Sequence, residues 1–180
     1  MKSAKNNFKR GFTLLEMIVS LGVFSIAILI SLSSIFSISD AQKKAVALQN
    51  ALDNLRFAIE AASKEIRTGS SFHCGSDISL TPQDCGGGAA FTFLNADGET
   101  VSYYQDQSQL LKKVGAALPQ SITAVTVKIE RLVFYVSGAP SGDGRQPRVT
   151  IVIEGKVSPT SRTETTLQLE TTVSQRKLDS

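Results

Sequence analysis

The first clear pattern in the chain is a long apolar run near its beginning. From Met17 to Ser39, 23 consecutive residues carry no charge, and Leu, Ile, Val and Phe predominate among them. A helix needs about 20 apolar residues to cross the hydrocarbon core of a bilayer, and this run contains no proline. The pattern therefore predicts a membrane-spanning helix.

The helix is expected to continue beyond the apolar run, because small and apolar side chains keep recurring every three or four residues. They comprise Ala27, Ser31, Ser34, Ile38, Ala41, Ala45, Leu48, Leu52, Leu55, Ile59, Ala62 and Ile66. The charged side chains lie off this line, and Gly69 suits a helix end. We therefore expect one helix from about Phe12 to Arg67, whose second half needs a sheet to cover its apolar face.

The rest of the chain reads as a loop followed by β-strands. Residues from Gly69 to about Ala89 are expected to form a loop, with an exposed, poorly ordered glycine run at its end. Alternating apolar residues then predict a hairpin that turns at residues 95–98, and further strands around 108–114, 125–136, 149–153 and 167–173. The alternation slips by one residue at Glu130–Arg131, which predicts a β-bulge or a bend. The predicted fold class is α+β: a long N-terminal helix packed on a C-terminal antiparallel β-sheet.

The positive charge of the chain is concentrated at its beginning. The formal net charge is +3, yet residues 12–180 carry 15 basic and 16 acidic side chains. The composition thus gives no basic body suited to nucleic acid. Basic residues flanking a membrane span favour the cytoplasmic side, so the part of the chain from Asp40 onward is expected outside the cytoplasm.

The segment KRGFTLLEMIVSLGVFSIAIL, which begins at Lys9, resembles the prepilin signature of type IV pilins and type II secretion pseudopilins. The resemblance covers about residues 9–32, and Glu16 lies at the position of the glutamate in the family's motif. It implies that a membrane aspartic peptidase cuts between Gly11 and Phe12 and that the new amino terminus on Phe12 is N-methylated. Unlike removal of a signal peptide, this cut leaves the apolar helix on the mature protein.

This resemblance gives Glu16 a physical role. A carboxylate within a bilayer costs several kcal/mol unless it is paired. Cleavage after Gly11 creates a cationic amine on Phe12, and in a filament Glu16 of one subunit could pair with this amine of a neighbour. In the isolated subunit Glu16 could instead pair with its own amine or reach the headgroups. Gly11 lacks a Cβ, which lets a peptidase approach the scissile bond closely.

The resemblance also implies an organisation into four segments. These are a cleaved leader at 1–11, a transmembrane and assembly helix at 12–39, its amphipathic continuation at 40–68 and an extracytoplasmic β-rich domain at 69–180. The implied partners are the prepilin peptidase and methylase, other pilin or pseudopilin subunits, the inner-membrane assembly platform and, before assembly, membrane lipid. The subunit would sit in the inner membrane as a single-pass protein and then enter a pilus or pseudopilus.

Two features favour a minor subunit over a major one. Many major pilins carry a proline in the apolar half of the helix, and no proline precedes Pro82 here. The stretch LQNALDNLRFAIEAASKEIR, from Leu48 on, resembles the corresponding region of J- and W-type minor subunits. The alternatives are a major pilin of the filament shaft and a secreted or membrane-anchored binding protein with an ordinary signal peptide.

Candidate chemistry elsewhere in the chain is sparse. Cys74 and Cys85 suit a local disulfide in an oxidising compartment, with two free thiols as the alternative. The single histidine, His73, is expected at the surface, and no catalytic constellation stands out. The segment NADGE carries too few ligands for a complete calcium loop and is taken as a turn. We expect neither a cofactor, a metal nor an enzymatic activity.

Overall fold

The computed structural model describes residues 11–75, 80–160 and 163–176. Nearly all of the expected leader at 1–11 lies outside the described residues. The chain divides into two compact units, Met1–Lys43 and Lys44–Ser180.

A single α-helix runs through the predicted region. Helix α1 spans Leu14–Thr68, so it begins two residues later and ends one residue later than the sequence suggested. The chain leaves the helix at Gly69, whose amide donates a hydrogen bond to the carbonyl of Ile66 at 3.0 Å. A side chain at position 69 would clash with the Phe93 ring and the Leu94 carbonyl. Glycine is thus required here by the close approach of a strand.

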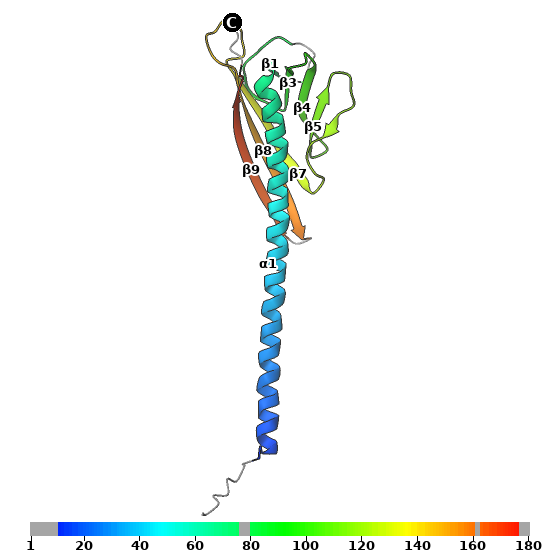
Figure 1. The fold of residues 1–180 in the computed structure, drawn as a ribbon, viewed down its shortest axis with the longest axis vertical. Coiled ribbons are helices and arrows are strands. Elements are labelled where there is room, and N and C mark those ends of the chain that lie inside the picture. The colour runs from blue at the N-terminus through cyan, green and yellow to red at the C-terminus, as the bar shows by residue number, and fades with distance from the viewer. Residues whose placement is uncertain (1–10, 76–79, 161–162, 177–180) are drawn as a thin grey trace, which may run out of the picture. The chain divides into compact units, whose positions relative to one another are not determined.

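Among the residues that the structure describes, nine strands follow the helix in the second unit, and Figure 1 shows their arrangement. They are β1 (Ser70–Cys74), β2 (Cys85–Gly88), β3 (Ala90–Leu94), β4 (Thr100–Asp106), β5 (Gln109–Val114), β6 (Gln120–Ser121), β7 (Val127–Ser137), β8 (Arg148–Thr160) and β9 (Thr163–Ser174). Sheet A has the strand order β1-β3-β4-β5-β6, and sheet B has the order β2-β7-β8-β9. The α+β class is confirmed, although the expected single sheet is divided into two antiparallel sheets.

Several local predictions are confirmed. Strands β3 and β4 form the expected hairpin, and the side chain of Asn95 accepts hydrogen bonds from the amides of Asp97 and Glu99 in its turn. The register of β7 against β8 shifts between Ile129 and Arg131, where the alternation slipped by one residue. Two residues on one strand there oppose one on the other, which is the definition of a β-bulge.

The expected loop between Gly69 and Ala89 is wrong in part, because it contains β1 and β2. The second of these is Cys85–Gly88, the segment that was expected to be poorly ordered, and it pairs with β7. Glycines give no alternating apolar signal, and backbone hydrogen bonds to a neighbouring strand need none. Strand β2 therefore forms because β7 offers it backbone partners, and not because of its own side chains.

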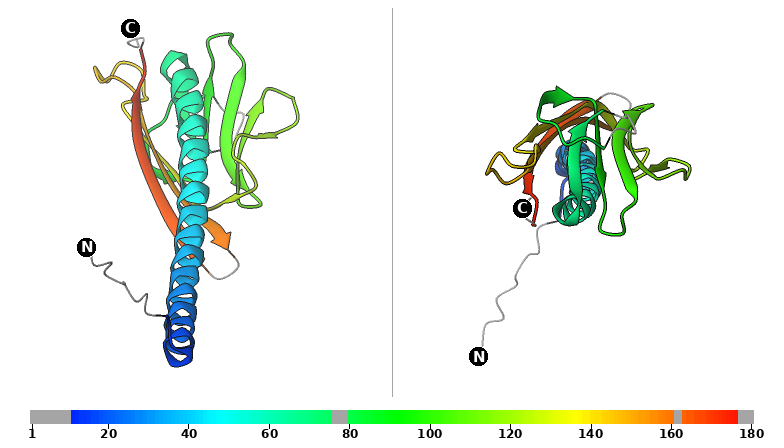
Figure 2. Two further views of the ribbon diagram at one scale, coloured as in Figure 1. Left: turned by 60° about the horizontal axis from the view of Figure 1, so that its bottom comes forward. Right: turned by 90° about the horizontal axis from the view of Figure 1, so that it is seen from above.

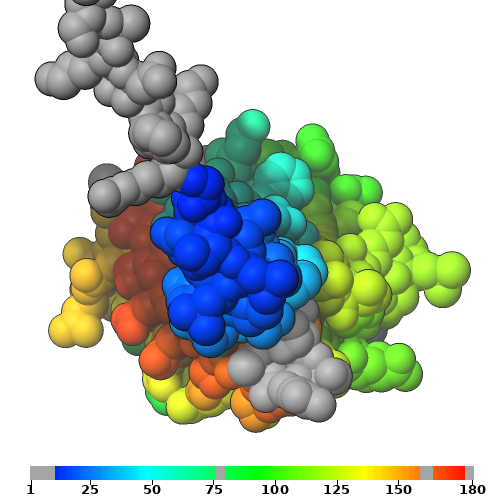
Figure 3. All heavy atoms as spheres, turned by 90° about the horizontal axis from the view of Figure 1, so that it is seen from below, coloured from blue at the N-terminus to red at the C-terminus, as the bar shows by residue number. Residues whose placement is uncertain are grey.

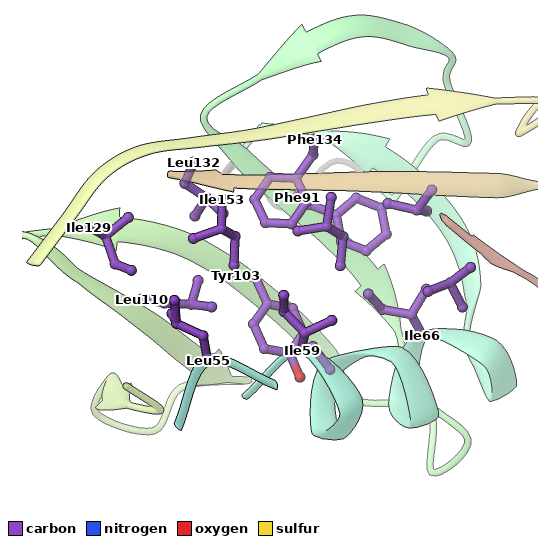
Figure 4. Close-up of a cluster of buried hydrophobic side chains, with 14 of the residues drawn as sticks. Leu55, Ile59, Ile66, Phe91, Tyr103, Leu110, Ile129, Leu132, Phe134 and Ile153 are labelled. Carbon is purple, nitrogen blue, oxygen red and sulfur yellow. The ribbon is translucent and has the colours of Figure 1, made fainter. Parts of the chain in front are cut away.

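The core of the second unit lies between the helix and both sheets (Figure 2). Figure 4 shows Leu55, Ile59 and Ile66 of α1 pointing at side chains from both sheets. The side chains that meet them include Phe91, Tyr103 and Leu110 of sheet A and Ile129, Leu132, Phe134 and Ile153 of sheet B. Leu55 and Ile66 are fully buried. The face predicted for the second half of the helix is thus the face that packs, and two further buried residues, Ala51 and Ala58, extend it beyond the predicted set.

A disulfide between Cys74 and Cys85 joins the two sheets. Cys74 ends β1 in sheet A, and Cys85 begins β2 in sheet B. Both cysteines are partly buried and pack against the core. The bond therefore adds a covalent link between two sheets that also meet through the core and through hydrogen bonds of Ile129 to Gln105 and Ser108.

Candidate functional site

The N-terminal end of α1 carries a helix cap built from Thr13. The three residues Gly11–Thr13 are not helical, and α1 begins at Leu14. The hydroxyl oxygen of Thr13 accepts a hydrogen bond from the amide of Glu16 at 3.3 Å, and its carbonyl accepts one from Met17 at 3.2 Å. Thr13 is therefore the N-cap residue, which satisfies an amide that has no partner within the helix.

Glu16 occupies the third position of the helix, within its first turn. Thr-x-x-Glu at these positions is the spacing of a capping box. The backbone dipoles of a helix leave partial positive charge at this end, which favours a carboxylate there. Glu16 is therefore held at the one end of the helix that suits its charge, and Phe12 precedes it by four residues.

The side chains at this end of the helix are exposed in the single subunit. Phe12 is 76% exposed, Leu14 78% and Leu15 74%. The space-filling view from below shows the described start of the chain, in dark blue, at the surface (Figure 3). So much uncovered apolar surface indicates that the segment buries itself against lipid or other chains.

Four of the seven serine hydroxyls within the apolar run bond to the helix backbone itself. The hydroxyls of four serines donate to backbone carbonyls one turn earlier, at 2.8–3.3 Å. These serines are Ser25, Ser31, Ser33 and Ser34. A membrane interior offers no water to polar groups, so hydroxyls bonded in this way are compatible with lipid. By length and composition, α1 contains a stretch that could cross a membrane.

The comparison with known families agrees with this geometry. The family described as "Prokaryotic N-terminal methylation motif" matches residues 6–32. No curated protein and no solved structure matches the chain. The matched motif, together with the long apolar helix that begins within it, supports a type IV pilin-like protein, a subunit of a pilus or pseudopilus.

The predicted site residues fall into two places. Gly11, Phe12 and Glu16 lie together at the start of α1, whereas Cys74 and Cys85 lie in the second unit. Sequence reasoning missed the role of Thr13 as the cap, although a threonine three residues before a glutamate at the start of an apolar run was the signal for it.

The expectation that His73 is a surface residue is wrong. His73 lies in β1 and is only 5% exposed, because that strand packs beside β3 over the core.

Among the residues that the structure describes, no three His, Cys, Asp or Glu side chains gather as a metal site.

A polar link in the second unit fastens the helix to sheet A. The carboxylate of Glu65 accepts a hydrogen bond from the Tyr103 hydroxyl at 2.6 Å, and it forms an ion pair with Lys112 at 2.8 Å. Tyr103 is only 2% exposed. Burial, followed by the hydrogen bond and the negative charge of Glu65, raises the pKa of Tyr103 above its ordinary value. The phenol therefore stays protonated and keeps donating to Glu65.

Proposed function

We propose that this chain is a non-enzymatic minor pilin or pseudopilin, cut between Gly11 and Phe12, methylated on the Phe12 amine and assembled through its N-terminal helix. The observation that carries this proposal is the match of the methylation motif to residues 6–32, which includes the capped start of an apolar helix. Under this proposal residues 1–11 are the leader, 12–39 the membrane and assembly helix, 40–68 its amphipathic continuation and 69–180 the extracytoplasmic domain.

The proposed partners and place in the cell follow from the same motif. The prepilin peptidase and methylase act on the N-terminus, and other pilin or pseudopilin subunits surround the helix after assembly. Before assembly the helix lies in the inner membrane, and the β-rich part lies outside the cytoplasm because the basic residues precede the span. An inner-membrane assembly platform then moves the subunit into the filament.

Glu16 is proposed to set the register of assembly. Cleavage exposes a cationic amine on Phe12, and methylation keeps that charge. Within a filament the apolar helices exclude water, so a carboxylate and an amine that meet there attract each other strongly, and leaving either one unpaired is costly. A subunit that slips along its neighbours would separate the two charges. The pair therefore favours one axial position.

The experiment compares Glu16→Ala with Glu60→Ala in sheared filaments. Both substitutions remove an exposed helix carboxylate, but Glu60 lies on the second-unit part of α1, away from the N-terminus. We expect Glu16→Ala to abolish or strongly reduce incorporation while Glu60→Ala assembles normally. Equal incorporation of both variants would contradict the proposed role of Glu16. The copy number of the wild-type subunit in the same filaments separates a minor subunit from a major one.

A further inference from the structure

A pocket of about 370 Å³ lies at the end of sheet B that is formed by the close of β7, the start of β8 and the close of β9. Its lining consists of Ser137, Gly138, Arg145, Gln146, Arg148 and Ser174. Two of these six residues are cationic and none is acidic. The pocket is therefore suited to a negatively charged group rather than to an apolar one.

Strand register places three of the lining residues in one row. Ser137 pairs with Arg148, and Arg148 pairs with Ser174. The adjacent row consists of Val136, Val149 and Val173, and it is buried in the core. Because successive side chains of a strand point to opposite faces, the row with Arg148 at its centre faces away from the core. A guanidinium is thus flanked by a hydroxyl on each side.

The loop between β7 and β8 contributes the second cation. Gly138 has a φ of +70°, and an added Cβ there would lie 3.1 Å from the Cβ of Arg145. The loop therefore folds back tightly, and Arg145 lies beside Gly138, where the loop leaves β7. The side chain of Gln146 donates to the carbonyl of Gln175, which fastens the loop to the end of β9.

Two carboxylates near the pocket accept hydrogen bonds from backbone amides. Asp143 accepts a hydrogen bond from the amide of Arg145 at 2.7 Å, and Asp84 accepts one from the amide of Ala139 at 2.7 Å. Within residues 11–75, 80–160 and 163–176, neither Arg145 nor Arg148 forms an ion pair. Two further arginines lie at this end of the unit, where the amide of Arg176 donates to the carbonyl of Arg67 at 2.8 Å. This end of the second unit therefore carries four arginines, Arg67, Arg145, Arg148 and Arg176, beside the carboxylates of Asp84 and Asp143.

We propose that this pocket binds a phosphate group, either free in solution or carried by a phosphodiester chain. Arginine presents a planar fork of donors that matches phosphate oxygens two at a time. The hydroxyls of Ser137 and Ser174 supply further donors on each side of Arg148. The proposal does not depend on whether the chain assembles into a filament, because every residue in it belongs to the second unit.

The test is calorimetric titration of the full-length protein in uncharged detergent at low ionic strength, with inorganic phosphate and, separately, a short oligodeoxythymidylate. The Arg145→Gln, Arg148→Gln double variant removes both cations, and Arg131→Gln removes an exposed arginine from the same sheet as the matched control. We expect saturable binding by the wild-type protein, at least about tenfold weaker in the double variant and within about twofold of wild type in the control. If the oligonucleotide binds more tightly than inorganic phosphate and is displaced by it, the natural ligand is a phosphodiester chain. If the two probes bind with equal affinity, the natural ligand is the free phosphate ion.

Two outcomes would overturn the proposal. One is the lack of saturable binding of either probe by the wild-type protein up to about 10 mM, and the other is an equal loss of affinity in the control and the double variant. Should the double variant fail to fold, a phosphate titration of the wild-type protein, followed through its arginine side-chain NMR signals, takes the place of the comparison between variants. Phosphate is then expected to shift the signals of Arg145 and Arg148 and to leave that of Arg131 in place.

Discussion

The hydroxyl of Tyr103 on β4 donates a 2.6 Å hydrogen bond to the carboxylate of Glu65 on α1, three residues before the helix ends. This bond joins an element from the first part of the chain to sheet A across 38 positions of sequence. It orients the last turns of the helix in a way that apolar packing alone does not, because a hydrogen bond is directional.

Tyr103→Phe removes the donor and leaves the ring in place. A hydrogen bond to a charged group contributes about 1.5–3 kcal/mol, so we expect the free energy of unfolding to fall by about 2 kcal/mol. Urea titration of the detergent-solubilised protein, followed by tyrosine fluorescence, measures it. Tyr104→Phe is the control, since Tyr104 lies only half-buried on the same strand, and its cost should stay within about 0.5 kcal/mol. Equal costs for both would refute the link.

The same tyrosine predicts how stability depends on pH. Burial and Glu65 raise the pKa of Tyr103 in the folded chain, whereas in the unfolded chain it is about 10. The contribution is therefore complete below about pH 10 and is lost as the pH rises from there toward the raised folded pKa. The difference in unfolding free energy between wild type and Tyr103→Phe should shrink above about pH 10. A difference that stays constant up to pH 11 would contradict this.

Leu55 and Phe57 test which face of the helix packs. Leu55 is fully buried and Phe57 is 71% exposed, although they lie two residues apart. Leu55→Ala should lower the free energy of unfolding by about 2–5 kcal/mol because it leaves a cavity. Phe57→Ala should change it by less than about 0.5 kcal/mol. Chemical denaturation of both variants under one set of conditions makes the comparison, and the reverse order would place the core on the other face.

The disulfide is expected to stabilise the second unit through the connection between its sheets. Cys74 and Cys85 are 11 positions apart in the sequence, and closing a loop of this length contributes about 2–4 kcal/mol. The Cys74→Ala, Cys85→Ala double variant should be less stable by this amount, as measured by urea titration. Dithiothreitol should lower the stability of the wild-type protein and leave that of the variant unchanged. A wild-type protein insensitive to reductant would argue against the bond.

The fold was predictable from the sequence where side chains alternate or repeat regularly. The helix Leu14–Thr68, the β3–β4 hairpin and the bulge after Ile129 each left a periodic signal. Strand β2 left none, because Cys85–Gly88 is mostly glycine and pairs only through its backbone with β7. The division into two sheets could not be predicted either, because which strands pair depends on how all of the core side chains pack together.

The candidate site was proposed from the sequence on different grounds. Its residues are adjacent in the sequence, so Gly11, Phe12 and Glu16 were assigned from the motif alone, and their roles in cleavage, methylation and assembly stay predictions. Thr13 was overlooked although its spacing from Glu16 carried the information. The Glu65–Tyr103 bond and the Arg145–Arg148 pocket join distant segments and become visible only once the strands are in register.

The cap at Thr13 can be tested by hydrogen exchange. Thr13→Ala removes the acceptor of the Glu16 amide, and loss of an N-cap costs about 0.5–2 kcal/mol. We expect the amides of Glu16 and Met17 to exchange faster in the variant, in detergent micelles. Thr13→Ser keeps a hydroxyl oxygen at the same place and should restore protection. Unchanged exchange in Thr13→Ala would show that the cap contributes nothing to the start of the helix.

The central claim is that cleavage before Phe12 turns an anchored precursor into an assembly-competent subunit. Mass spectrometry of the N-terminal peptide, taken from protein recovered from its native cells, tests this most directly. The account predicts a mature chain that begins at Phe12 with a methylated amine and retains the apolar helix. A chain that keeps residues 1–11, or one that begins beyond the apolar run at about Ser34, would contradict it.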